Sequence, residues 1–175
     1  MGSACGGRSS YASGGAELYA SLGIEGTTYE IGFEAVRRAL GDIRGQVFLD
    51  FGCGAGRSAA FLRSLGAGRV YGVDRDQDMI GQALAMRLDG VVFTHVDEVI
   101  PLPDESVDGA VSLNVFIELR SLAEMGRACR EVASTLRQAG LTVTAIGYPM
   151  PRDPSAWSTD EALLSPCIVL TAVKA

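Results

Sequence analysis

The stretch LDFGCGAG, Leu49 to Gly56, sets three alternate glycines directly after a short β-rich run, Gln46 to Phe51. The residues that follow, Arg57 to Leu65, have a helical pattern that ends at Gly66. Strand, glycine turn and helix in this order are typical of a nucleotide site, because glycines let the backbone turn tightly and a ligand approach closely. The alternative is a tight turn without a ligand, and three glycines at this spacing favour the ligand.

The same alternation of strands and helices continues on both sides of this turn. A capping box at Thr27 and Glu30 opens a helix that ends before Gly41, Asp76 caps a second, and a box at Ser121 and Glu124 opens a third. β-rich runs predict further strands at residues 69–74, 91–95, 108–113, 141–146 and 167–174. The predicted fold class is therefore α/β: a doubly wound, Rossmann-like, mainly parallel sheet with helices on both faces and an antiparallel C-terminal edge strand.

Length and composition favour one globular domain. The chain has 175 residues, of which 47% are hydrophobic and 21% charged, which excludes a disordered or collagen-like protein. We expect residues 1–10, rich in glycine and serine, to form a flexible tail. Residues 11–175 then make a single domain.

Charge, apolar runs and cysteine spacing limit the partners and the location that we expect. Fifteen Lys and Arg against 21 Asp and Glu give a net charge of -6, which disfavours a nucleic-acid partner. No apolar run is long enough to cross a membrane, and no signal peptide is evident. The four cysteines are far apart and His95 is the only histidine, so we expect no metal site, reduced thiols and a cytoplasmic protein.

Charge also decides which ligand suits the glycine turn. A dinucleotide site has the spacing G-x-G-x-x-G, whereas here the third glycine is Gly56 and Arg57 follows it. Asp50 comes just before the turn, where a carboxylate repels phosphates and suits an ammonium group. Asp74 ends the second strand, 18 residues beyond Gly56, where a carboxylate accepts hydrogen bonds from ribose hydroxyls. The sequence therefore predicts a cationic nucleoside as ligand.

At these residues the chain resembles the class I S-adenosylmethionine-dependent methyltransferases, in particular the small-molecule group with the turn Leu-Asp-x-Gly-Cys-Gly-x-Gly. The resemblance covers about Tyr19 to Ile146 and includes Val73-Asp74 and the segment from Ile100 to Asp108. It implies S-adenosyl-L-methionine as cofactor.

The resemblance assigns cofactor-binding roles to residues along the chain. Asp50 would face the ammonium group, Asp74 would hold the ribose, and Asp97 would meet the adenine amino group with Glu98 beside it. For Asp97 the alternative is a solvated loop carboxylate, because the spacing from Asp97 to the Leu-Pro-like pair that follows is one residue shorter than expected in the family. The turn glycines Gly52, Gly54 and Gly56 would pass beneath the methionine moiety. Tyr19 would lie in a segment that closes over the cofactor, and Asn114, after the fourth strand, would line the methyl-donor pocket.

Catalytic candidates are few because methyl transfer from a sulfonium needs mainly alignment of the reacting atoms. Glu118 lies four residues past Asn114 and is a candidate base or acceptor-binding group, with a surface acid as the alternative. Tyr148 follows the fifth strand and is a candidate for the acceptor pocket.

A short segment before the last strand and the lack of an obvious base leave the function open between classes. Only about twenty residues, Gly147 to Pro166, separate the fifth strand from the last, fewer than in relatives. The first hypothesis is a methyltransferase for a small-molecule acceptor, in specialised metabolism. The alternatives are a non-catalytic S-adenosylmethionine-binding relative or partner subunit and, on the fold alone, a nicotinamide-dependent oxidoreductase. An exposed sheet edge would also favour a homodimer.

Overall fold

The computed structural model describes the sheet, the helices on one of its faces and part of the opposite face. Described are residues 15–21, 28–97, 100–103, 106–113, 115, 130, 136–137, 140–147 and 169–174. The expected tail, residues 1–10, and most of the helix expected after Ser121 lie outside this range.

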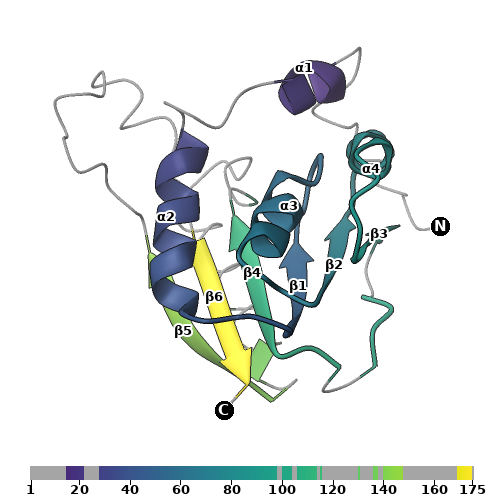
Figure 1. Ribbon diagram of the computed structural model, residues 1–175. Coiled ribbons are helices and arrows are strands. Elements are labelled where there is room, and N and C mark those ends of the chain that lie inside the picture. The colour runs from purple at the N-terminus through teal and green to yellow at the C-terminus, as the bar shows by residue number, and fades with distance from the viewer. Residues whose placement is uncertain are drawn as a thin grey trace, which may run out of the picture.

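One six-stranded sheet organises the described residues (Figure 1). Its spatial order is β3-β2-β1-β4-β6-β5. The first four strands pair in parallel, whereas β6 is antiparallel to both of its neighbours. The strands are β1 (Val47–Phe51), β2 (Arg69–Asp74), β3 (Val91–His95), β4 (Gly109–Leu113), β5 (Leu141–Gly147) and β6 (Val169–Lys174).

This sheet confirms the predicted fold class and the antiparallel direction of the last strand. One detail differs, because β6 lies between β4 and β5 and β5 takes the outer position. The inner position gives the apolar β6 two hydrogen-bonded neighbours. It also packs Val173 against the core beneath α2 (Thr28–Leu40).

The described helices, apart from the first, begin at the residues that the sequence marks; the sequence predicts no helix at residues 15–21. Besides α2 they are α1 (Gly15–Ser21), α3 (Arg57–Ser64) and α4 (Gln77–Ala85). The Asp76 carboxylate caps α4 by accepting hydrogen bonds from the backbone N–H groups of Asp78 (2.9 Å) and Met79 (3.1 Å). In Figure 1, α2 and α3 cover one face of the sheet. No described helix is long and apolar enough to cross a membrane.

Two apolar clusters hold the sheet from its two faces. Phe48 and Val111 point toward α2 and α3, where the rings of Phe33 and Phe61 stack with centroids 4.4 Å apart. Successive strand residues alternate between faces, so Leu49 and Ala110 point the other way and pack with Leu136 and the segment around Ile100. Burial on both faces of β1 and β4 fixes the face toward which each of their residues points, Asp50 included.

Candidate functional site: a glycine turn between two carboxylates

The glycine turn lies at the carboxyl end of β1, where the chain order of the sheet reverses. From β1 the chain continues to β2 and β3 on one side and returns to β4 on the other. Ligands of doubly wound sheets bind at such a point. The backbone N–H groups of Gly52 and Cys53 both donate to the carbonyl oxygen of Val73, at 2.8 and 3.0 Å, so the turn is fixed to the end of β2.

Glycine is required in the turn by backbone conformation and by packing. Gly52, Gly54 and Gly56 have φ angles of 74°, 51° and 91°, a region that other residues rarely adopt. A Cβ on Gly52 would lie 2.1 Å from Cγ2 of Val115, and one on Gly56 would lie 2.8 Å from Cζ of Phe93. Protein side chains therefore occupy the space beside two of the three glycines.

Asp50 is the buried acid of the site. Its side chain is 0% exposed, and its Oδ2 accepts a hydrogen bond of 2.6 Å from the Ser58 hydroxyl, in the first turn of α3. No donor among the described residues bonds its other oxygen, Oδ1. Burial raises the pKa of Asp50 to about 7; hydrogen bonding from Ser58 and the Ala59 backbone lowers it, and the charge of Asp74 raises it.

Asp74 is the half-buried acid of the site and is bonded to the turn directly. Its Oδ2 accepts a hydrogen bond of 2.8 Å from the backbone N–H of Gly54, and its Oδ1 accepts one of 2.9 Å from the N–H of Asp76. Each carboxylate oxygen has two lone pairs, so both can accept a further hydrogen bond from a ligand. Asp74 thus orders the turn and still offers acceptors at its edge.

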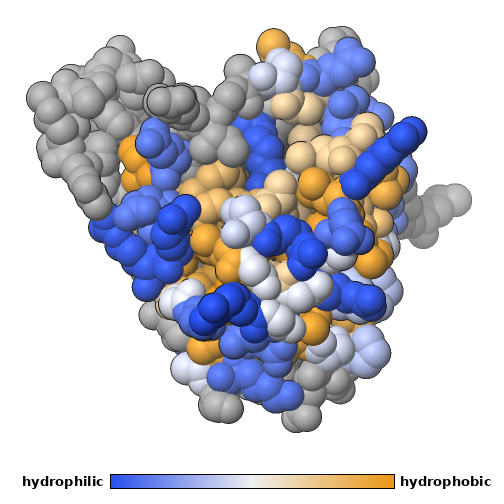
Figure 2. Space-filling model, viewed as in Figure 1, coloured by the Kyte–Doolittle hydropathy of each residue, from blue (hydrophilic) through white to orange (hydrophobic). Residues whose placement is uncertain are grey.

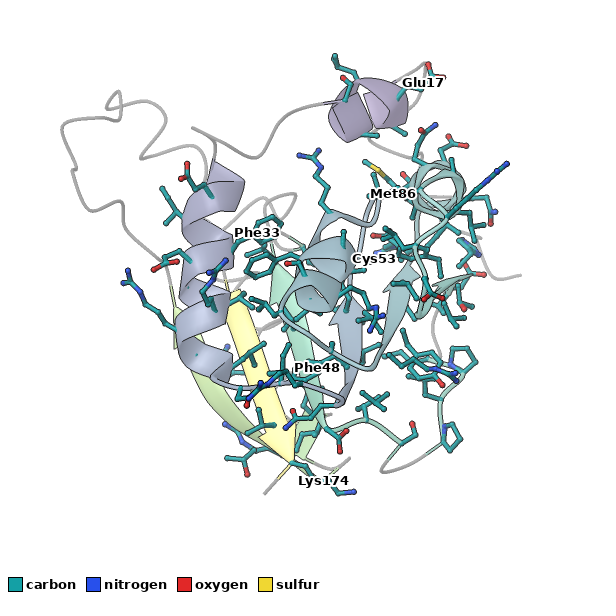
Figure 3. All side chains as sticks on the ribbon, in the orientation of Figure 1. Glu17, Phe33, Phe48, Cys53, Met86 and Lys174 are labelled. Atoms are coloured by element: carbon teal, nitrogen blue, oxygen red, sulfur yellow. The ribbon has the colours of Figure 1, made fainter. Side chains whose placement is uncertain are left out.

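Cys53 is a packing residue within the turn. It is 4% exposed, and Figure 3 shows it between α3 and β2. Burial and the charges of Asp50 and Asp74 raise the pKa of its thiol, which therefore stays protonated and unreactive.

A short helix that comes before the sheet in the chain covers the glycine turn. Ala16 of α1 packs with Ala55 of the turn and with Met79 of α4. In Figure 1, α1 lies beyond the carboxyl ends of β1 and β2. Tyr19 belongs to this helix, so its backbone lies in the segment that covers the turn.

The structure leaves Asp97 at the surface. It follows β3, whose last residue, His95, pairs in register with Asp74, so Asp97 is at the same end of the sheet as the turn. Its side chain is 88% exposed, and its Oδ1 lies 3.8 Å from Nε2 of His95. The other predicted site residues lie outside the described residues: Glu98, Asn114, Glu118 and Tyr148.

Sequence reasoning missed three residues that shape this site. Ser58 bonds Asp50, and the only signal for it is a hydroxyl near the start of the helix after the turn. Arg57 opens the same helix and is 8% exposed, which is unusual for an arginine. Phe93 packs beside Gly56 and beside Gly72, the residue of β2 that pairs with Phe93 in register. The sequence offers no signal for this packing.

The arrangement suits a ligand with a positive charge and with hydroxyl groups. Two carboxylates flank a turn whose N–H groups at Gly52, Cys53 and Gly54 already donate within the protein. The buried carboxylate has one oxygen that no described donor bonds. A diphosphate would meet repulsion from both acids. S-adenosylmethionine, which has an ammonium group, a sulfonium and ribose hydroxyls, fits these two carboxylate acceptors.

Comparison with known proteins points in the same direction. A family model described as a methyltransferase domain matches residues 49–144. The chain is similar to the solved structure of an S-adenosylmethionine-dependent methyltransferase from Mesorhizobium loti, with 16% identity and a TM-score of 0.58, over 87% of this chain and 100% of that one.

Two further solved structures share the fold. One is a complex between the Trm112 methyltransferase activator of Haloferax volcanii and a methyltransferase, with 18% identity, a TM-score of 0.55 and coverage of 90% and 96% of the two chains. The other is geranyl diphosphate C-methyltransferase from Streptomyces coelicolor with S-adenosyl-L-homocysteine bound, with 13% identity, a TM-score of 0.53 and coverage of 83% and 80%. The predicted resemblance to the class I S-adenosylmethionine-dependent methyltransferases is confirmed.

Proposed function

The chain belongs to the methyltransferase domain family, whose cofactor is S-adenosylmethionine, and from this premise we propose that it transfers a methyl group to a small-molecule acceptor, in specialised metabolism. The observation that supports the proposal best is the pair of acids at the glycine turn, with Asp50 buried beneath it and Asp74 bonded to Gly54. The acidic net charge of -6 further favours a small acceptor over a nucleic acid.

The residues of this chain act mainly by binding and alignment. S-adenosylmethionine, when bound, would supply a methyl group that its sulfonium already activates, with S-adenosylhomocysteine as the leaving group. In the proposal Asp74 accepts hydrogen bonds from the ribose hydroxyls and Asp50 receives the ammonium group. The turn supplies backbone contacts at Gly54, and holding the donor rigidly accounts for much of the expected rate.

The remaining site residues enter as parts of the proposal. Tyr19 in α1 and Asn114 after β4 flank the cofactor, and Asp97 and Glu98 receive the adenine. Glu118 is the candidate base or acceptor-binding group, and Tyr148 lines the acceptor pocket. We place the protein in the cytoplasm, where a thiol such as that of Cys53 stays reduced.

Calorimetric titration with S-adenosylmethionine and S-adenosylhomocysteine tests the proposal. We expect both to bind in the micromolar to sub-millimolar range and NAD to give no signal. Methyl-labelled S-adenosylmethionine with a panel of small acceptors then tests turnover. Binding without any turnover favours the non-catalytic alternative, and absence of binding by both nucleosides contradicts the proposal itself.

We further propose that the protein forms a homodimer along β3. This strand is outermost in the described sheet, and Val91 to His95 include no acidic, lysine or arginine side chain that would discourage pairing. Val92 is 46% exposed, and Leu84 and Met86, in α4 and directly after it, are 55% and 41% exposed. Figure 2 shows apolar surface over α4, which carries Leu84.

Sedimentation velocity at micromolar concentration measures this association. We expect a dimer for the unmodified chain and a monomer for Val92→Lys, because a lysine on the edge strand opposes pairing. Val92→Lys should bind S-adenosylhomocysteine normally, which controls for folding. A monomeric unmodified chain would exclude the dimer.

A further inference from the structure

Ser58 links the first turn of α3 to the buried acid of the site. Its Oγ lies 2.6 Å from Oδ2 of Asp50, eight residues earlier in the chain, and the Ser58 residue is 9% exposed. Such short bonds are typical of a hydroxyl that donates to a carboxylate. Because the bond engages Oδ2, it restricts rotation of the carboxyl group and fixes the direction in which Oδ1 points.

We propose that Ser58 is a positioning residue for the cofactor: its hydroxyl orients Asp50 and favours the ionised carboxylate, so that Oδ1 can receive the ammonium group of the nucleoside. The inference rests on the proposed function, since it assumes that this nucleoside binds at the turn. It adds a residue to the site whose effect on the cofactor passes through Asp50.

The groups around Asp50 make this bond consequential. Asp74 of β2 contributes a negative charge, which opposes ionisation of Asp50. Cys53 of the turn keeps its proton and adds no negative charge. On α3, Arg57 precedes Ser58 and is cationic, and the two strand residues in register with Asp50 are uncharged, Gly72 of β2 and Val111 of β4. Ser58, together with the backbone of Ala59, thus counteracts both burial and Asp74.

The sign of the pH dependence follows from these neighbours. With its pKa near 7, ligand-free Asp50 is protonated in mildly acidic solution. A ligand ammonium favours the ionised form, so binding releases a proton below that pH. Affinity should then rise about tenfold per pH unit up to about pH 7 and level off above it. Losing the Ser58 bond raises the pKa of Asp50 and moves this plateau to higher pH.

The experiment compares Ser58→Ala with the unmodified chain by calorimetry with S-adenosylhomocysteine. The pH runs from about 5.5 to 8.5, a range in which the affinity of each protein should rise and then level off. We expect Ser58→Ala to bind about tenfold more weakly at pH 6.5, with the deficit shrinking as the pH rises. Ser64→Ala is the matched control, because Ser64 lies on the same helix and its hydroxyl donates to the carbonyl of Phe61 at 2.7 Å. It should follow the unmodified profile.

A second ligand separates positioning from a general loss of structure. 5′-Methylthioadenosine is a related nucleoside without the amino-acid portion, so its affinity should show neither the pH dependence nor the Ser58→Ala deficit. If Ser58→Ala does not fold, Ser58→Cys, a similar side chain with a weaker donor, takes its place. Superimposable pH profiles for the variant and the unmodified chain would overturn the role of Ser58. Absence of S-adenosylhomocysteine binding by the unmodified chain at every pH would instead overturn the proposed function.

Discussion

Replacement of Asp74 by alanine is expected to weaken S-adenosylmethionine binding by about 1–3 kcal/mol, or roughly 5- to 150-fold. The loss has two sources. The ribose loses a charged acceptor, and the turn loses the bond of 2.8 Å from the Gly54 N–H, so that Gly54 is held less firmly. Calorimetric titration at constant pH and salt measures the change.

Asp74→Asn separates these two sources. The amide retains one acceptor oxygen, which can serve Gly54 or Asp76 but not both, so we expect an affinity between those of alanine and aspartate. Asp108→Ala is the matched control, because the Asp108 carboxylate accepts a bond of 2.8 Å from the Val47 N–H at the opposite end of β1. This control should lose stability and keep its affinity. Equal affinities for Asp74→Ala and Asp108→Ala would remove Asp74 from the site.

The same substitution should also change how binding depends on pH. The charge of Asp74 raises the pKa of Asp50, so its removal lowers that pKa. The plateau of affinity then begins at lower pH in Asp74→Ala, the opposite direction to Ser58→Ala. The two acids therefore act on the ligand together, because the charge of Asp74 changes the pH at which Asp50 is ionised.

The sequence predicts the elements well because their signals are local. Apolar runs that each follow a glycine predict β2 and β3 with the bounds that the structure has. The carboxylate of Asp76 begins α4 because it can cap the helix within three residues. The glycine turn is recognisable because positive φ angles restrict the residue type at three alternate positions.

Strand order and side-chain partners escape the sequence because they depend on the three-dimensional packing. The apolar pattern of β6 predicts a strand but not its place between β4 and β5. Likewise, Phe93 packs beside Gly56 only because β3 and β2 pair in one register. The bond between Ser58 and Asp50 depends on the angle at which α3 leaves the turn, which no spacing rule gives.

Substitution of Gly54 by valine is expected to have the largest effect, a loss of binding of at least about 100-fold, beyond calorimetric detection. At a φ of 51° a β-branched residue is strained, so the backbone must move and the hydrogen bond from its N–H to Asp74 weakens. In the proposed site the new side chain would also stand where the methionine portion of the cofactor passes.

Gly45→Val is the matched control for this prediction. Gly45 has a φ of 75°, no described atom lies within 4 Å of a Cβ built there, and it precedes the opposite end of β1. Both variants should lose a similar stability in thermal denaturation, about 1–3 kcal/mol from the strained backbone, while only Gly54→Val loses the cofactor. Normal binding by a folded Gly54→Val would show that the cofactor does not pass the turn, because valine would then occupy no part of its path.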